Sequence, residues 1–124
     1  MTRYEKGLKK LEEVCGEAGL DVVKSLQSVC PDLAQYTVEF PYGDVHSRPG
    51  LDAKSREISI VSSLIALGYA GPQLKVHILA ALNVGCSETE IKEIIILMTV
   101  YAGFPAALNA MMVAKEAFAE HKAS

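Results

Sequence analysis

Two ionisable residues, Glu57 and His77, lie within apolar helical patterns of this sequence. Glu57 is in SREISIVSSLIAL and His77 is in QLKVHILAAL, and both are followed at i+3, i+4 and i+7 by aliphatic residues. A chargeable group on a buried stripe costs free energy unless it is paired or used. A carboxylate beside an imidazole fixes the ring tautomer and supports its protonated form, so the two residues could transfer protons. The spacing equally allows a buried structural Glu–His or Glu–Arg bond.

The segment PYGDVHSRPGL (residues 41–51) is the one long stretch without helical periodicity, with two prolines, two glycines and several polar residues. We expect an irregular loop, which either carries function or simply connects helices. Arg48 in this loop could hold an anionic ligand through its planar guanidinium. It could equally be solvated or pair with Glu57. His46 is a further candidate for substrate binding, and an exposed position suits it equally well.

Tyr42 and Tyr101 could each offer a hydroxyl group at the edge of an apolar pocket, or lie in the core with that hydroxyl satisfied. Met98, Met111 and Met112 fall on helical stripes and are expected to fill the core rather than to line a cofactor site.

Several chemistries have no motif here. The sequence contains no glycine-rich phosphate loop, no H-E-x-x-H and no G-x-S-x-G. Three dispersed histidines do not indicate a metal site. The cysteines, Cys15, Cys30 and Cys86, lack metal or redox spacing, and their odd number fits a reducing cytosol. The residues therefore predict neither a metal site nor one of these motif-based chemistries.

Composition narrows the class of partner. The 124 residues are 50% hydrophobic and 6% aromatic, more apolar surface than one small domain can bury, which favours a homo-oligomer. A net charge of −3 argues against nucleic acid. The charged N-terminus resembles no secretory signal, so a cytoplasmic location is expected. Residues 94–114 are uncharged and long enough for a membrane span, but Gly103 and Pro105 predict two helices meeting at a bend.

The elements that position these residues are helical nearly throughout. Capping and breaking residues, including an S-x-x-E capping box at Ser87 and Glu90, place the helix ends. Gly16 and Gly19 interrupt the first helical stretch. The expected helices cover about 2–14, 20–29, 31–40, 53–67, 72–83, 88–101 and 105–119. They predict an all-α bundle with a central pair of apolar helices, organised as a single domain over 1–124 with its core at about 31–118 and N-terminal helices at 2–30.

Three strings carry a resemblance to a known family: YGDVHSRPGLDAKSRE (42–57), QLKVHILAALNVGCSETEI (73–91) and VYAGFPAALNA (100–110). They closely resemble the carboxymuconolactone decarboxylase family over roughly residues 31–118. The resemblance implies an all-α fold that assembles into rings, commonly a hexamer built as a trimer of dimers. It also implies common ancestry with the alkylhydroperoxidase D-like proteins, which are thiol-dependent peroxidases.

The peroxidase branch carries a C-x-x-C-x-x-x-H motif with a glutamate upstream. His77 and Glu57 match its histidine and glutamate, but Ala70 and Gln73 occupy the two cysteine positions. Dithiol chemistry should therefore be absent. The decarboxylase branch needs no cysteine: 4-carboxymuconolactone loses carbon dioxide to give a dienolate, which must be stabilised and protonated on carbon.

The sequence thus predicts a cofactor-independent decarboxylase of aromatic-compound catabolism, acting on a small carboxylated lactone. In that interpretation His77 donates the proton, Glu57 orients the His77 ring and Arg48 anchors the substrate. The further binding residues are Tyr42, His46 and Tyr101. Two alternatives remain open. One is a thiol peroxidase or disulfide reductase using Cys86, which lies just before a helix N-terminus where a thiolate is favoured. The other is a non-catalytic ring that binds small molecules.

Overall fold

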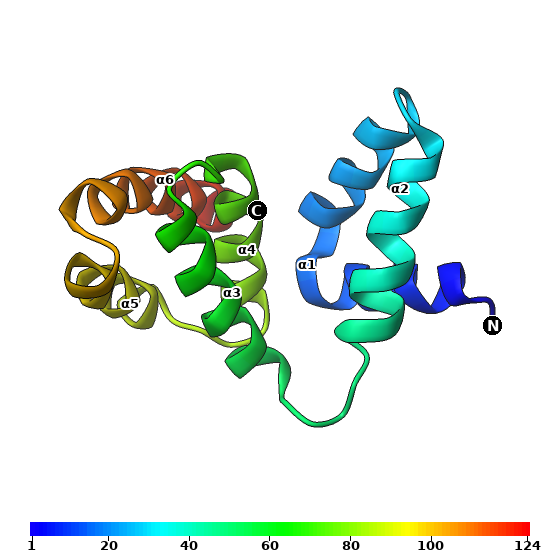
Figure 1. The fold of residues 1–124 in the computed structure, drawn as a ribbon, viewed down its shortest axis with the longest axis horizontal. Helices are drawn as coiled ribbons and strands as arrows, with labels where there is room; N and C mark the ends of the chain where they lie inside the picture. Colours follow the sequence, from blue (N-terminus) through cyan, green and yellow to red (C-terminus); the bar gives the residue numbers. More distant parts are fainter. The chain divides into compact units, whose positions relative to one another are not determined.

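The computed structural model describes all residues from 1 to 124 and contains helices only (Figure 1). The prediction of an all-α fold is confirmed. The chain divides into two compact units, Met1–Ala53 and Lys54–Ser124. The organisation as a single domain over 1–124 stays a prediction.

The first unit contains α1 (Arg3–Gln27), α2 (Pro31–Val38) and the π-helix η1 (Glu39–Val45). Gly16 breaks α1 with a φ of 61° and a ψ of −149°, as predicted, whereas the interruption predicted at Gly19 is wrong. Gly19 is buried, and a Cβ there would lie 2.6 Å from the Cβ of Cys15. Its smallness thus serves packing rather than a turn.

The predicted irregular loop at 41–51 is partly wrong, because residues 41–45 belong to η1. The backbone N–H of His46 donates to the carbonyl of Pro41 at 2.7 Å, the i→i+5 pattern of a π-helix. Arg3 of α1 ties this segment down, since its Nε lies 3.1 Å from both carboxylate oxygens of Asp44. The hydrogen bond and the charge of Arg3 lower the pKa of Asp44.

The second unit contains α3 (Ala53–Leu67), α4 (Gly71–Asn83), α5 (Glu88–Tyr101) and α6 (Phe104–Ala123). The predicted ends of α3 and α4 hold to within a residue, and the capping box at the start of α5 is present in both directions. The break predicted inside 94–114 is also present, where Gly103 takes a φ of 96° between α5 and α6. No helix combines the length and hydropathy that a membrane span requires.

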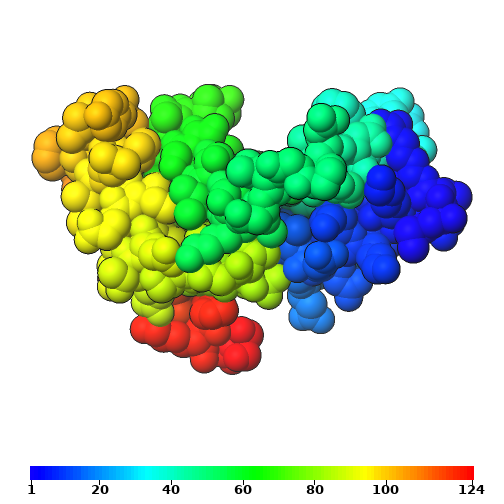
Figure 2. All heavy atoms as spheres, turned by 90° about the horizontal axis from the view of Figure 1, so that it is seen from below, coloured from blue at the N-terminus to red at the C-terminus, as the bar shows by residue number.

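The core of this unit draws on all four helices, with Ile65, Ile78, Ile91 and Ile95 almost fully buried. On α6, small side chains at 107, 110, 114 and 117 face this core, which lets α6 lie close to α4 and α5. In Figure 2 the red C-terminal end of α6 lies against the yellow-green chain. Lys122, near the end of α6, pairs with Glu88 of α5 at 3.7 Å.

Candidate functional site

Glu57 and His77 meet across α3 and α4. Oε1 of Glu57 lies 2.8 Å from Nδ1 of His77, a hydrogen-bond distance. The Glu57 side chain has no exposed area, whereas that of His77 is 18% exposed. The pairing predicted from two apolar stripes is therefore formed within one unit.

Helical register explains why the carboxylate is buried. Val61 and Ile65, one and two turns after Glu57, are buried in the core, so the same face of α3 carries Glu57 inward. His77 precedes Ile78, which is fully buried, and lies at the edge of the packed face of α4. The two helices thus hold a fully buried acid against a half-buried imidazole.

The hydrogen bonding of the two residues is incomplete. Oε2 of Glu57 is buried and has no hydrogen-bond partner. An unsatisfied buried polar atom costs about 1–3 kcal/mol, and native structures contain few. On the histidine, Nδ1 is engaged by Glu57, which leaves Nε2 as the ring nitrogen available to a ligand. With Glu57 ionised, Nδ1–H donates to it, and Nε2 can accept or deliver a proton.

Tyr42 and His46 come together in the first unit. Their rings stack with centroids 4.3 Å apart and planes 14° from parallel. Both residues are buried, and the Tyr42 hydroxyl lies 3.3 Å from Sγ of Cys15. Tyr42 therefore has the core environment, with its hydroxyl engaged, that the sequence left as one alternative. The exposed position considered for His46 is not what the structure shows.

Arg48 and Tyr101 are both exposed. Arg48 follows η1, where its backbone N–H donates to the carbonyl of Val45 at 3.2 Å. Tyr101 ends α5 with 77% of its surface exposed, so it is not a core tyrosine. Because Arg48 belongs to the first unit and His77 to the second, their joint action on a substrate stays a prediction.

Cys86 does not have the environment of a reactive thiol. It is 5% exposed, and burial, followed by the negative charge of Glu90, raises its pKa. The expectation that the start of α5 favours a thiolate at Cys86 is therefore wrong. The capping Glu90 brings a negative charge to the same helix end, and Lys54, 3.1 Å from that carboxylate, opposes its effect only in part.

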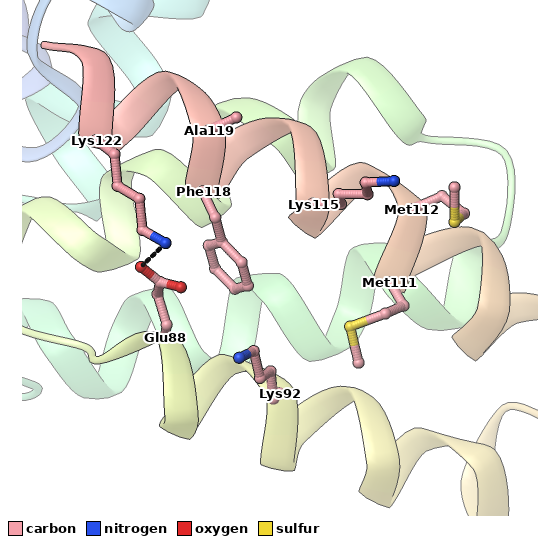
Figure 3. A pocket seen from close by; sticks show the side chains of 8 residues that line it. All are labelled: Glu88, Lys92, Met111, Met112, Lys115, Phe118, Ala119 and Lys122. Atoms are coloured by element: carbon pink, nitrogen blue, oxygen red, sulfur yellow. Dashed lines mark ion pairs between the residues drawn. The ribbon is translucent and has the colours of Figure 1, made fainter.

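Methionines and lysines of α5 and α6 line a surface hollow that the sequence patterns did not indicate. Met98 and Met111 pack against the core as expected, but Met112 is 60% exposed, so its assignment to the core is wrong. Met111 and Met112 line a hollow that also receives Lys92 and Lys115 (Figure 3). In the sequence, only the spacing of these lysines and methionines along two helices could have pointed to the hollow. The same spacing is common on helix faces that are simply exposed to solvent.

Comparison with known proteins agrees with the resemblance in the sequence. Residues 31–116 match the model of the Carboxymuconolactone decarboxylase family. The chain is 36% identical over 117 residues to 4-carboxymuconolactone decarboxylase of Acinetobacter baylyi, covering 94% of this chain and 87% of that protein. It is 30% identical over 116 residues to nitrosuccinic acid decarboxylase of Metarhizium robertsii, covering 91% and 79%. The chain belongs to the carboxymuconolactone decarboxylase family.

Proposed function

We propose that this protein is a decarboxylase that removes carbon dioxide from a small carboxylated lactone by acid–base chemistry, without a metal or organic cofactor. The observation that carries the proposal is the 2.8 Å contact between a fully buried carboxylate, Glu57, and a half-buried imidazole, His77. A carboxylate that holds one ring nitrogen of a histidine leaves the other nitrogen free for general acid–base chemistry.

The proposed reaction begins with a substrate whose carboxylate is vinylogous to a lactone carbonyl: it is carried on the saturated carbon next to a carbon–carbon double bond, and that double bond is conjugated to the carbonyl. Cleavage of the bond to the carboxylate releases carbon dioxide, and the electron pair moves through the double bond onto the carbonyl oxygen as a dienolate. A proton delivered to carbon then gives the enol-lactone. Stabilising the dienolate charge and supplying that proton are the two tasks left to the protein.

His77 would supply the proton from Nε2, since Nδ1 is held by Glu57. Glu57 would orient the ring and stabilise its protonated form. Arg48, an exposed residue, would anchor a substrate carboxylate through two parallel hydrogen bonds from its guanidinium. Tyr101 stays a secondary candidate for substrate binding, whereas Tyr42 and His46, buried and stacked on each other, are weaker candidates.

The names of the two relatives support the reaction class. One acts on 4-carboxymuconolactone and the other on nitrosuccinic acid. A lactone carbonyl reached through a double bond and a nitro group can both accept the electron pair that a departing carboxylate leaves. We therefore place this chain's substrate among small carboxylates that carry such an electron-accepting group, with the lactone preferred because the sequence identity is higher.

We also propose that several copies assemble through α5 and α6. Large apolar side chains on these helices are more than half exposed: Ile96, Leu97, Val100, Phe104 and Leu108. Positions 96, 97, 100 and 101 share one face of α5, and 104 and 108 share one face of α6. An apolar surface of this kind normally marks an interface. The number of copies, six in the sequence-based prediction, belongs to the same proposal.

The substrate is tested by incubating purified protein with 4-carboxymuconolactone and, separately, with nitrosuccinate, and by measuring carbon dioxide release and product formation. We expect turnover of the lactone and slower or no turnover of nitrosuccinate. Faster turnover of nitrosuccinate would mean that the substrate is a nitro acid and not a lactone. Stabilisation against heat by either compound, without any turnover, would favour the non-catalytic binding ring.

A further inference from the structure

A hollow of about 540 Å³ lies between α5 and α6, and none of its lining residues belongs to the Glu57–His77 site. Its apolar wall comes from Met111, Met112 and Phe118 of α6 (Figure 3). Phe118 and Met111 point from α6 toward α5 in this view, with the Lys92 side chain opposite them. The volume falls in the range of sites that hold small organic molecules.

The charges around this hollow are unbalanced. Lys122 pairs with Glu88 at 3.7 Å, at one end of it. Lys92 and Lys115 also line it, and neither forms an ion pair; the Nζ of Lys92 lies 5.8 Å from the centre of the Phe118 ring. Two exposed ammonium groups beside an apolar wall attract a ligand that is both anionic and apolar.

We propose that this hollow is a second binding site, for an aromatic carboxylate. The thioethers of Met111 and Met112, with the small part of Phe118 that is exposed (8%), offer polarisable contacts that favour an aromatic ring over an aliphatic chain. Lys92, opposite Phe118, then receives the carboxylate as a point charge, and Lys115, whose ammonium group points away from α5 in Figure 3, adds positive charge at the rim. The site is independent of the proposed decarboxylation, so it can be tested without any turnover.

The four methionines of the chain supply a direct test. Protein labelled with ¹³C at the methionine methyl groups is titrated with trans-cinnamate and, as a matched neutral probe, with trans-cinnamamide, and methyl spectra are recorded. We expect saturable shifts of the Met111 and Met112 signals with cinnamate, while Met1 stays in place as an internal reference. Signals are assigned with single Met→Leu variants.

The role of charge is tested with Lys92→Gln and Lys115→Gln, both on exposed positions, and with Lys24→Gln on α1 as the control. We expect each of the first two to weaken cinnamate binding about twofold to fivefold, and the control to leave it unchanged. Equal binding of cinnamamide, or no loss in either variant, would overturn the proposal of an anion site. Shifts that follow protein concentration and not cinnamate would assign the hollow to contact with a second copy and overturn it too. Methyl shifts confined to Met98, or no methyl shifts at all, would also overturn the proposal of a binding site in the hollow.

Discussion

Nδ1 of His77 and Oε1 of Glu57 lie 2.8 Å apart, while the second oxygen of the same carboxylate is buried without a hydrogen-bond partner. The arrangement keeps a carboxyl group in the core with one of its two oxygens unpartnered. Apolar side chains of similar size would avoid this cost. On this ground we propose that the pair serves chemistry rather than stability.

The stability of a Glu57→Leu/His77→Leu double variant checks this directly. We expect its free energy of unfolding to equal that of the wild type or to exceed it by up to about 4 kcal/mol, because a buried, incompletely hydrogen-bonded polar pair is replaced by apolar packing. Ser59→Leu, on the exposed face of α3, is the control for added leucine. Urea unfolding measures both. A double variant destabilised by more than about 2 kcal/mol would show that the contact is structural.

The thiol of Cys86 should react slowly with alkylating reagents. Its raised pKa leaves less thiolate at a given pH, so its alkylation should rise only at higher pH. We compare iodoacetamide reaction of Cys15→Ser/Cys30→Ser, which keeps Cys86, with that of Cys15→Ser/Cys86→Ser, which keeps the exposed Cys30. Cys86 should react at least about tenfold more slowly. Equal rates at neutral pH would reopen a thiol-based function.

Charge on the α5–α6 surface should disrupt assembly. Val100 is 72% exposed and Leu108 62% exposed, so a glutamate at either position is solvated in a single chain but unfavourable in an apolar interface. Light scattering coupled to gel filtration should give smaller species for Val100→Glu and Leu108→Glu than for the wild type. Val29→Glu, on a residue 84% exposed in the other unit, is the control. Unchanged masses for both test variants would place the interface elsewhere.

Gly7 should tolerate no side chain. A Cβ at this position would lie 2.3 Å from the carbonyl oxygen of Val38, so α1 and the end of α2 could not keep their spacing. We expect Gly7→Ala to lower the free energy of unfolding by about 1–3 kcal/mol despite the better helix propensity of alanine. Gly50→Ala, where nothing lies within 4 Å, is the matched control. Equal stability of the two variants in urea would contradict the close packing.

Local signals in the sequence were sufficient for most helix boundaries. Ser87 and Glu90 cap α5 through their own side chains, and Gly68 and Gly103 take positive φ values beside helix ends. The π-helix at 39–45 was not predictable in this way. It packs on α1, where Gly43 lies close to the backbone of Arg3 and Asp44 pairs with the side chain of Arg3. Those contacts join residues about forty positions apart.

The candidate site was predictable to a similar extent. Two apolar stripes interrupted by Glu57 and His77 predicted their pairing, because the cost of burial leaves few alternatives. The stripes could not show that one carboxylate oxygen lacks a partner, since that depends on every neighbouring side chain. For Cys86 the sequence was misleading. Its position before a helix suggested a reactive thiol, but burial and the charge of Glu90 raise the pKa of the thiol instead.

We propose that His77, held by Glu57, delivers a proton during decarboxylation. The rate of enol-lactone formation from 4-carboxymuconolactone by His77→Gln tests this role, with His121→Gln on the exposed end of α6 as the matched control. Loss of a general acid should lower kcat by about 10²–10⁴-fold, while circular dichroism shows an unchanged fold and the control retains wild-type turnover. Wild-type kcat in folded His77→Gln would contradict the account.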